Sequence, residues 1–388
     1  MTLGRGDYRA VVVGAGIMGL YTAHHLARAG AGPLLVVDRG RLSAGGSGRN
    51  GGGVRQQWET RSTIRLAREA VAAYRRFDRE FGHNLWFRQG GYLFLASDPS
   101  ELERLQRVRD AGRAEGLPVR LLGTDEVEAL VDGIAPEACV GGCYLASDGT
   151  LYPYPAVWGL YEAVRALGVE VALGTEALGV RRGDRGEVVE LRTSSGPVRT
   201  PTVVNAAGGW SGELSRRCGL DVPNVATRHE ILATEPMKAF LDPMLVRVSD
   251  GLYVSQSMRG ELVGGLTVPH PPGTDAGVPS SPRFVTAMAH ALVGLLPRAA
   301  GLGVLRAWAG FYDDTPDGFP VIGEDPRLPG FVHANGFGGH GFMLAPSASR
   351  RVAATVLREP VDLDPREFSP GRFLGAGAAP SSERLQLG

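Results

Sequence analysis

The stretch AVVVGAGIMGLYTAHHLARAGAGPLLVVDRG, residues 10–40, decides the fold of this chain. Residues 10–13 are apolar without alternation, which is typical of a parallel strand buried on both faces. Gly14, Gly16 and Gly19 then follow with the spacing G-x-G-x-x-G. In a dinucleotide-binding turn the first glycine permits the bend, the second lets backbone approach a pyrophosphate, and the third lets the helix pack on the strand. The stretch therefore predicts a Rossmann-type nucleotide-binding unit.

The segment after the glycine turn completes this unit. A helix is expected over about 17–29, with its N-terminal amides facing the phosphate, and a second buried strand over 34–37. Asp38 ends that strand nineteen residues beyond Gly19, where a carboxylate can accept hydrogen bonds from an adenosine ribose. This favours a cofactor with a free 2′-hydroxyl, FAD or NAD, even though Arg39 follows.

The composition narrows the class of protein. The chain has 388 residues, 43% of them hydrophobic, and a formal net charge of zero. This length supports two domains, and the balanced charge argues against nucleic acid as a partner. No apolar run approaches the roughly 18 residues of a membrane span, and no signal peptide precedes the first strand. We expect a soluble cytoplasmic protein, with its oligomeric state left open.

Reactive side chains are few. Cys139 and Cys143 are four residues apart, and Cys218 is the only other cysteine, so we expect reduced core thiols with no disulfide framework and no metal site. Lys238 is the only lysine and lies beside a proline in TEPMKAF. A lysine Schiff base is therefore discarded. His229 and His270 are isolated and are expected to be structural.

The rest of the chain favours FAD over NAD. A nicotinamide dehydrogenase of the doubly wound type would continue with alternating strands and helices. This chain instead has the glycine-arginine stretch GGSGRNGGGVRQQW at 45–58, and the nucleotide-binding pattern resumes only at 154–180, 200–214 and 330–357. Between the last two lies a β-rich region over about 228–268. We predict an α/β, two-domain fold in which separated segments assemble one FAD-binding domain.

The predicted domain boundaries follow from this pattern. The FAD-binding domain is assigned to 1–85, 140–220 and 318–375. A substrate domain of mainly antiparallel sheet plus helices is assigned to 86–139 and 221–317. Residues 376–388 have small and polar composition and are expected to be a disordered tail.

At this point the chain resembles a known family, the FAD-dependent amine and amino-acid oxidases of the D-amino-acid oxidase type. That family includes sarcosine oxidases, glycine oxidase and related bacterial dehydrogenase subunits. The matching stretches span roughly residues 8–360 and are VVVGAGIMGLYTAHHLARAG (11–30), GGSGRNGGGVRQQ (45–57), VVNAAGGWS (203–211), WAGFYDDTPDGFPVIG (308–323) and HANGFGGHGFMLAP (333–346).

The resemblance implies a reaction. Hydride leaves the carbon next to an amine nitrogen for flavin N5, and water hydrolyses the resulting imine. The substrate would be an amino acid or N-alkyl amino acid, with O2 as electron acceptor. The alternative is the catalytic subunit of a dehydrogenase that passes electrons to a partner or a quinone. A nicotinamide-dependent dehydrogenase and a non-catalytic binding module are the competing classes.

The resemblance also implies site residues. Arg55 would pair with the substrate carboxylate, since a guanidinium holds a carboxylate through two parallel hydrogen bonds; binding of flavin phosphate or a structural carboxylate is the alternative. His340 would lie near the flavin, as a helix-start contact or a general base. Catalytic residues are predicted as Arg55, Tyr253 and His340. The predicted substrate pocket consists of Arg55, Tyr253, Trp308, Tyr312 and Met343, each of the last four with core packing as the alternative.

A larger group of residues is expected to contact the cofactor. These are Gly14, Gly16, Ile17, Met18, Gly19, Asp38, Arg39, Ser47, Arg49, Asn50, Gly51, Gly52, Ala177, Ala206, Ala207, Gly208, Trp210, Gly310, Gly336, Gly338, Gly339, His340, Gly341, Phe342 and Met343.

Four positions depart from the relatives. Glycine oxidase has a carboxylate-binding arginine where this chain has Tyr312, and monomeric sarcosine oxidase has a lysine where Met343 stands. The cysteine that bonds covalently to flavin is replaced by Gly310, so FAD is expected to be non-covalent. Val263 occupies the position of the lysine that assists oxygen reduction, which favours the dehydrogenase alternative.

Overall fold

A six-stranded sheet carries the glycine fingerprint in the computed structural model, which describes residues 7–274, 278–374 and 383. Its strand order is β18-β19-β12-β1-β2-β8, and every neighbouring pair is parallel except β18 with β19. The strands are β1 (Ala10–Val13), β2 (Leu34–Asp38), β8 (Glu170–Leu173), β12 (Val203–Asn205), β18 (Val321–Glu324) and β19 (Phe331–Asn335). Segments from both ends of the chain thus form one nucleotide-binding sheet.

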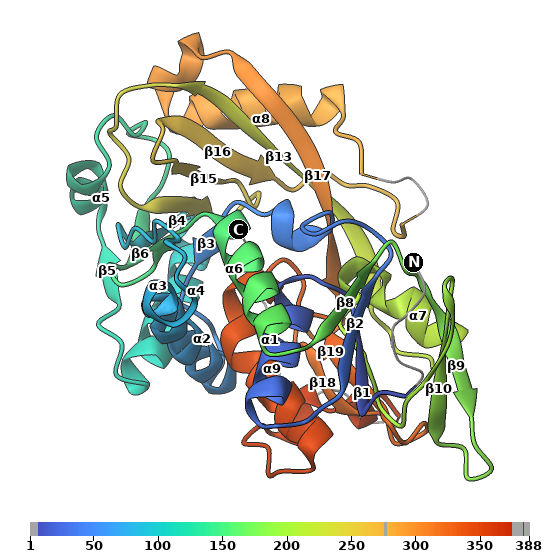
Figure 1. The fold of residues 1–388 in the computed structure, drawn as a ribbon. Helices are drawn as coiled ribbons and strands as arrows, with labels where there is room; N and C mark the ends of the chain where they lie inside the picture. The colour runs from blue at the N-terminus through green and yellow to red at the C-terminus, as the bar shows by residue number, and fades with distance from the viewer. Residues whose placement is uncertain (1–6, 275–277, 375–382, 384–388) are drawn as a thin grey trace.

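Helices cover one face of this sheet, and a small sheet covers the other (Figure 1). The helices that lie together are α1 (Ile17–Arg28), α6 (Pro153–Ala166) and α9 (Gly341–Leu357), with α2 (Arg61–Tyr74) packed against α9. The small antiparallel sheet consists of β9 (Ala177–Arg182), β10 (Val188–Thr193) and β11 (Gly196–Arg199).

Alternate residues of β1 point to different cores. Ala10 and Val12 belong to the core shared with α1 and α9, whereas Val11 and Val13 belong to the core shared with the small sheet. Because both faces are covered, the strand needs apolar residues at every position. This confirms the strand predicted from residues 10–13.

An eight-stranded, mostly antiparallel sheet forms the second layer of the molecule. Its order is β17-β13-β16-β15-β14-β4-β6-β5, with only the β14–β4 pair parallel. The strands are β4 (Tyr92–Ala96), β5 (Arg120–Leu122), β6 (Gly141–Leu145), β13 (Val225–Pro236), β14 (Met244–Arg247), β15 (Tyr253–Gln256), β16 (Glu261–Leu266) and β17 (Val304–Asp314).

Helix α8 (Pro282–Leu295) covers the face of this sheet that points away from the six-stranded sheet (Figure 1). Its buried residues Phe284, Met288 and Leu292 pack in one core with Leu232 of β13 and Val254 of β15. The opposite face is left for the nucleotide-binding part of the chain. The two-domain fold class is therefore confirmed.

Strand β6 corrects one predicted boundary. Residues 140–220 were assigned to the FAD-binding domain, but β6 pairs with β4 and β5 in the eight-stranded sheet. An apolar run of this length does not reveal which sheet it joins. The other domain boundaries stay predictions.

Residue Glu383 corrects part of the predicted tail. Residues 376–382 and 384–388 lie outside the described residues, but Glu383 is only 3% exposed. Its carboxylate accepts hydrogen bonds from the Thr60 backbone N at 3.1 Å and the Thr60 hydroxyl at 2.8 Å, where α2 begins. A carboxylate at a helix N-terminus is favoured by the helix dipole, so disorder is the wrong description of this position.

No helix within the described ranges is long and apolar enough to cross a membrane.

Candidate active site

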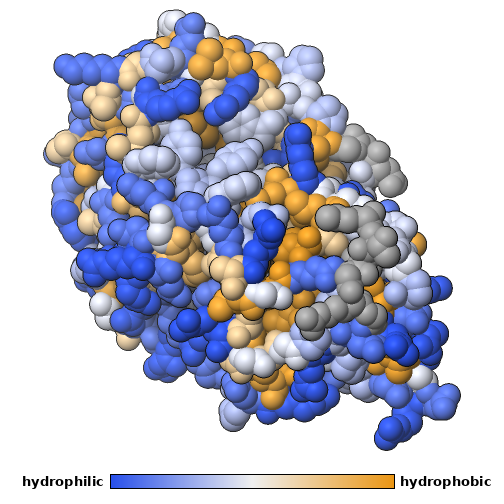
Figure 2. Space-filling model, in the orientation of Figure 1, coloured by the Kyte–Doolittle hydropathy of each residue, from blue (hydrophilic) through white to orange (hydrophobic). Residues whose placement is uncertain are grey.

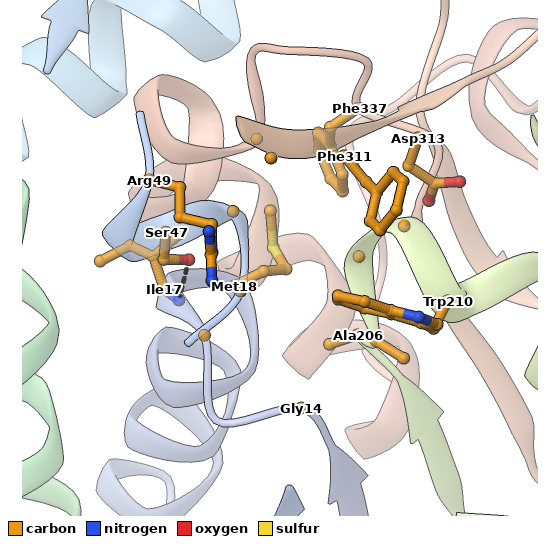
Figure 3. A pocket seen from close by; sticks show the side chains of 18 of the residues that line it. Gly14, Ile17, Met18, Ser47, Arg49, Ala206, Trp210, Phe311, Asp313 and Phe337 are labelled. Carbon is orange, nitrogen blue, oxygen red and sulfur yellow. Dashed lines mark hydrogen bonds between the residues drawn. The ribbon is translucent and has the colours of Figure 1, made fainter. Parts of the chain in front are cut away.

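A pocket runs between the two sheets. Its cavity of about 410 Å³ is lined by β1, β2 and β19 on one side and by β13, β14, β15 and β17 on the other. Apolar surface runs down the middle of this face of the molecule between hydrophilic flanks (Figure 2). In the close view, Ile17, Met18, Ser47 and Arg49 lie across the cavity from Trp210 and Phe311 (Figure 3).

The glycine turn brings bare backbone to the pocket wall. Gly14 has φ +113°, and a Cβ there would lie 2.3 Å from the Ala206 carbonyl oxygen. Only glycine fits that conformation and that approach. The Ile17 amide, the first of α1, donates to Ser47 Oγ at 2.9 Å (Figure 3). The start of the helix and the glycine loop therefore share one end of the cavity, as an anion-binding site requires.

Asp38 is held by two backbone donors. Its Oδ2 accepts from the Ala15 amide at 2.8 Å and its Oδ1 from the Gly40 amide at 2.7 Å. Beside it, the Arg39 guanidinium lies 4.2 Å from the centre of the Trp210 ring. Each carboxylate oxygen keeps a further lone pair for a ligand, which fits the predicted ribose contact.

Arg49 fastens the glycine loop to the second sheet. Its Nε donates to the Ala44 carbonyl at 2.7 Å, and a terminal nitrogen donates to the Ala309 carbonyl of β17 at 2.9 Å. The indole N–H of Trp308 donates back to the Arg49 carbonyl at 2.8 Å. Trp308 does not line the cavity, so its predicted place in the substrate pocket is not supported; it supports the loop instead.

Most of the predicted cofactor residues line the cavity. They are Gly14, Gly16, Ile17, Met18, Asp38, Arg39, Ser47, Arg49, Asn50, Gly51, Ala177, Ala206, Ala207, Gly208, Trp210, Gly310, Gly338, Gly339, Gly341, Phe342 and Met343. This cradle of backbone, small residues and a helix N-terminus fits a dinucleotide, because added side chains would fill the space that its phosphates need.

Three predicted cofactor glycines lie outside the lining. A Cβ on Gly19 would meet the Gly14 carbonyl oxygen at 1.9 Å, so this glycine serves helix packing. Gly52 has φ +77° and Gly336 has φ +72°, where L residues are strained. Their role in the structure is to shape the two loops that bound the cavity.

Tyr312 and its neighbours form the wall contributed by the eight-stranded sheet. The His229 ring stacks on the Tyr312 ring at 3.7 Å with 15° between planes, and the Tyr253 hydroxyl lies close enough to that of Tyr312 for each to affect the pKa of the other. Burial raises the pKa of Tyr312 to about 12. Burial, and then the nearby His270, lower the pKa of His229 to about 4. Tyr312, Tyr253 and His229 are therefore uncharged near pH 7.

Arg55 lies behind the pocket and not in it. The side chain is 0% exposed, and one terminal nitrogen donates to the Gln57 carbonyl at 2.8 Å. The other donates to His340 Nε2 at 3.1 Å. The guanidinium carbon is 3.8 Å from the Trp58 ring centre. Neither Arg55 nor His340 lines the cavity, so direct contact with substrate or cofactor, which was predicted for both, is not supported.

The lining also includes residues that the sequence did not single out. Phe311, Asp313 and Phe337 line the cavity (Figure 3). His229, which was expected to be structural, lines it as well. The Asp313 carboxylate accepts from the Gly336 amide at 2.7 Å, and burial raises its pKa to about 7. Phe311 and Asp313 lie inside the family motif at 308–323, so that motif was the sequence feature that could have identified them as site residues. His270 is structural as predicted, because its ring bonds Glu230 at 2.6 Å.

Comparison with known proteins agrees with this geometry. Residues 9–355 match the family described as FAD dependent oxidoreductase. The chain is 28% identical to the sarcosine oxidase subunit beta of Rhodobacter capsulatus, over 96% of this chain and 91% of that protein. It is 29% identical to a glycine oxidase of Pseudomonas aeruginosa, over 93% and 98%.

Two further relatives are dehydrogenases. A crystal structure of L-proline dehydrogenase from P. horikoshii superposes with a TM-score of 0.89 at 28% identity, over 95% of this chain and 98% of that one. The mitochondrial sarcosine dehydrogenase of Mus musculus is 28% identical over 94% of this chain, which spans only 41% of that longer protein. The chain belongs to the family of FAD dependent oxidoreductases, and FAD is its cofactor.

Proposed function

We propose that the protein oxidises the C–N bond of an amino acid or N-alkyl amino acid to an imine, which water then hydrolyses. The observation that carries this proposal is the position of the neutral tyrosine wall, opposite the glycine cradle across one cavity. Sarcosine oxidase, glycine oxidase and L-proline dehydrogenase among the relatives support this substrate class. When bound, FAD supplies the acceptor for a hydride from the carbon next to nitrogen.

The side chains act by position and by excluding water. Asp38 and Ser47 hold the cofactor end, Arg49 ties the glycine loop to β17, and Tyr253 and Tyr312 close the substrate end. Holding two reactants in a productive geometry contributes up to about 7–11 kcal/mol to lowering a barrier. The chain presents no lysine at the pocket, so a covalent amine intermediate has no part in the proposal.

O2 is the proposed electron acceptor, and an electron-accepting partner or quinone is the second candidate. The second candidate is favoured by a specific observation: the only lysine, Lys238, lies outside the lining, so no lysine stands beside the cavity to assist oxygen reduction. The similarity to two dehydrogenases points in the same direction.

The test is an anaerobic screen of D-, L- and N-methyl amino acids for bleaching of the flavin absorbance. Bleaching by at least one amino acid, with an imine-derived carbonyl product, is expected. A yellow protein that no amino acid bleaches contradicts the proposal. Peroxide formed in air at the rate of bleaching identifies O2 as the acceptor, whereas bleaching with little peroxide identifies a partner or quinone. Acid or heat is expected to release free FAD, because the attachment is proposed to be non-covalent.

A further inference from the structure

At the substrate end of the pocket, the lining residues of the eight-stranded sheet that the structure describes include no arginine or lysine, and Arg55, behind this wall, acts on the Tyr312 hydroxyl through its charge. The side chains that the eight-stranded sheet contributes there include His229, Ile231, Met244, Tyr253, Phe311 and Tyr312. The arginines of the lining are engaged by other groups: Arg39 stacks on Trp210, and Arg217, at the end of helix α7 (Ser211–Arg217), pairs with Glu176. The Arg49 side chain points toward Ile17 and Ser47 (Figure 3) and donates to the Ala44 and Ala309 carbonyls.

The polar groups at this end include the hydroxyls of Tyr312 and Tyr253 and the ring of His229. Of these, the Tyr312 side chain has its ring fixed from three sides. His229 stacks on one ring face. Gly339 allows close approach, because a Cβ there would lie 2.4 Å from Tyr312 Cζ. Tyr253 lies beside the hydroxyl itself, close enough to affect its pKa. A side chain held this firmly presents its hydroxyl in one position, as a specificity-determining group must.

A tyrosine pair has two hydroxyl protons, and a hydrogen bond between the two hydroxyls can use only one of them. Burial keeps both phenols protonated near pH 7 by raising the pKa of Tyr312 to about 12 and that of Tyr253 well above its ordinary value. One O–H therefore stays available for a hydrogen-bond acceptor in the cavity. In an amino acid the acceptor is the carboxylate, because the ammonium group can only donate.

We propose that Tyr312 binds the acyl oxygen of the substrate as a neutral hydrogen-bond donor, so that amides of amino acids are bound and oxidised alongside the acids. This inference rests on the proposed function of the same pocket. A guanidinium selects a carboxylate through its charge, but a phenol donates to a neutral carbonyl as well. His229, being neutral, also carries an acceptor nitrogen that an amide N–H can meet.

Two effects set the expected discrimination between acid and amide. A hydrogen bond to a charged oxygen is stronger than one to a neutral oxygen, which favours the acid. Taking a carboxylate out of water with no cation beside it costs free energy, which favours the amide. Because the two effects oppose each other, we expect the acid and its amide to differ by no more than about tenfold in efficiency.

The experiment uses matched pairs, sarcosine with sarcosinamide and L-proline with L-prolinamide, on the FAD-loaded protein. Two quantities are measured for each: the rate of anaerobic flavin bleaching, and the dissociation constant from the perturbed flavin spectrum. Tyr312→Phe keeps the ring and its stacking but removes the donor, and it is expected to weaken acid and amide alike by about tenfold. Tyr92→Phe is the control, since its buried hydroxyl has no hydrogen-bond partner among the residues that the structure describes and does not line the cavity.

Similar constants for acid and amide, both weakened in Tyr312→Phe and neither in Tyr92→Phe, support the inference. A preference for the acid above about a hundredfold, or an unaffected Tyr312→Phe, overturns it. If no compound bleaches the flavin, the proposed function fails, but the binding constants still decide this inference: equal constants support it, and binding of the acid alone, or of neither compound, overturns it.

Discussion

Replacement of Arg55 tests whether its guanidinium stabilises the fold or binds the substrate carboxylate. In the structure the guanidinium donates to Gln57 and His340 and lies over Trp58, with no exposed surface. Arg55→Ala would leave the Gln57 carbonyl without its charged donor, worth about 1.5–3 kcal/mol, and remove the aromatic contact, worth about 0.5–2 kcal/mol. It would also open a cavity.

Relief of a buried charge offsets part of this loss. We therefore expect Arg55→Ala to lower the free energy of unfolding by roughly 3–5 kcal/mol. Arg55→Met keeps the apolar volume and leaves mainly the unmet polar groups, so its loss should be roughly 1–3 kcal/mol. Guanidinium unfolding followed by tryptophan fluorescence measures both values on the FAD-loaded protein.

A substrate clamp makes a different prediction. It requires both variants to lose affinity for an amino acid by about a hundredfold, as expected when a charged pair is removed, while affinity for the amide is kept. The structural assignment of Arg55 is refuted if Arg55→Met shows that selective loss with an unfolding free energy within about 0.5 kcal/mol of the wild type.

Three further predictions concern the cofactor end and the buried acids. Gly14→Ala forces a Cβ to 2.3 Å from the Ala206 oxygen at φ +113°. The purified variant should therefore lose the yellow colour of bound FAD and unfold at a lower temperature. A fully FAD-loaded variant would contradict this. Ser47→Ala leaves the Ile17 amide without its acceptor, and a rise of about tenfold in the FAD dissociation constant is expected in a reconstitution titration. Burial raises the pKa of Asp148 to about 7, above its unfolded value of about 4. The folded state therefore holds a proton that the unfolded state releases, and the stability of wild type relative to Asp148→Asn should fall as the pH rises from about 4 to about 7; a rise would refute the shift.

Local features of the fold were predictable from the sequence. The turn at Gly14, the helix from Ile17 and the acid at Asp38 lie within one short segment, and their spacing alone specifies the geometry. The residues of this segment meet each other whatever the rest of the chain does. The cofactor end of the pocket was therefore largely predictable.

Long-range features were not predictable in the same way. Arg55 was placed in the pocket because it follows the glycine loop, but its position depends on Trp58, on Phe94 of β4 and on His340, which is 285 residues away. An arginine at this position could bind the substrate carboxylate or lie buried against other side chains. Packing by distant segments decides which of the two occurs. The place of His229 on the cavity wall could not be predicted for the same reason, since its partner Tyr312 comes from a different strand.

The interleaving of the sheets has a consequence for how the chain folds. Strand β4, at residues 92–96, lies between β6 and β14, and β14 begins only at Met244. Strand β19 joins β12 near the end of the chain, and α9 then packs on α1 from its beginning. Neither sheet can therefore be completed until most of the chain has been synthesised. Contacts this far apart in sequence slow folding, so partly synthesised chains expose unpaired strand edges and depend on protection from aggregation until residue 357 or so has emerged.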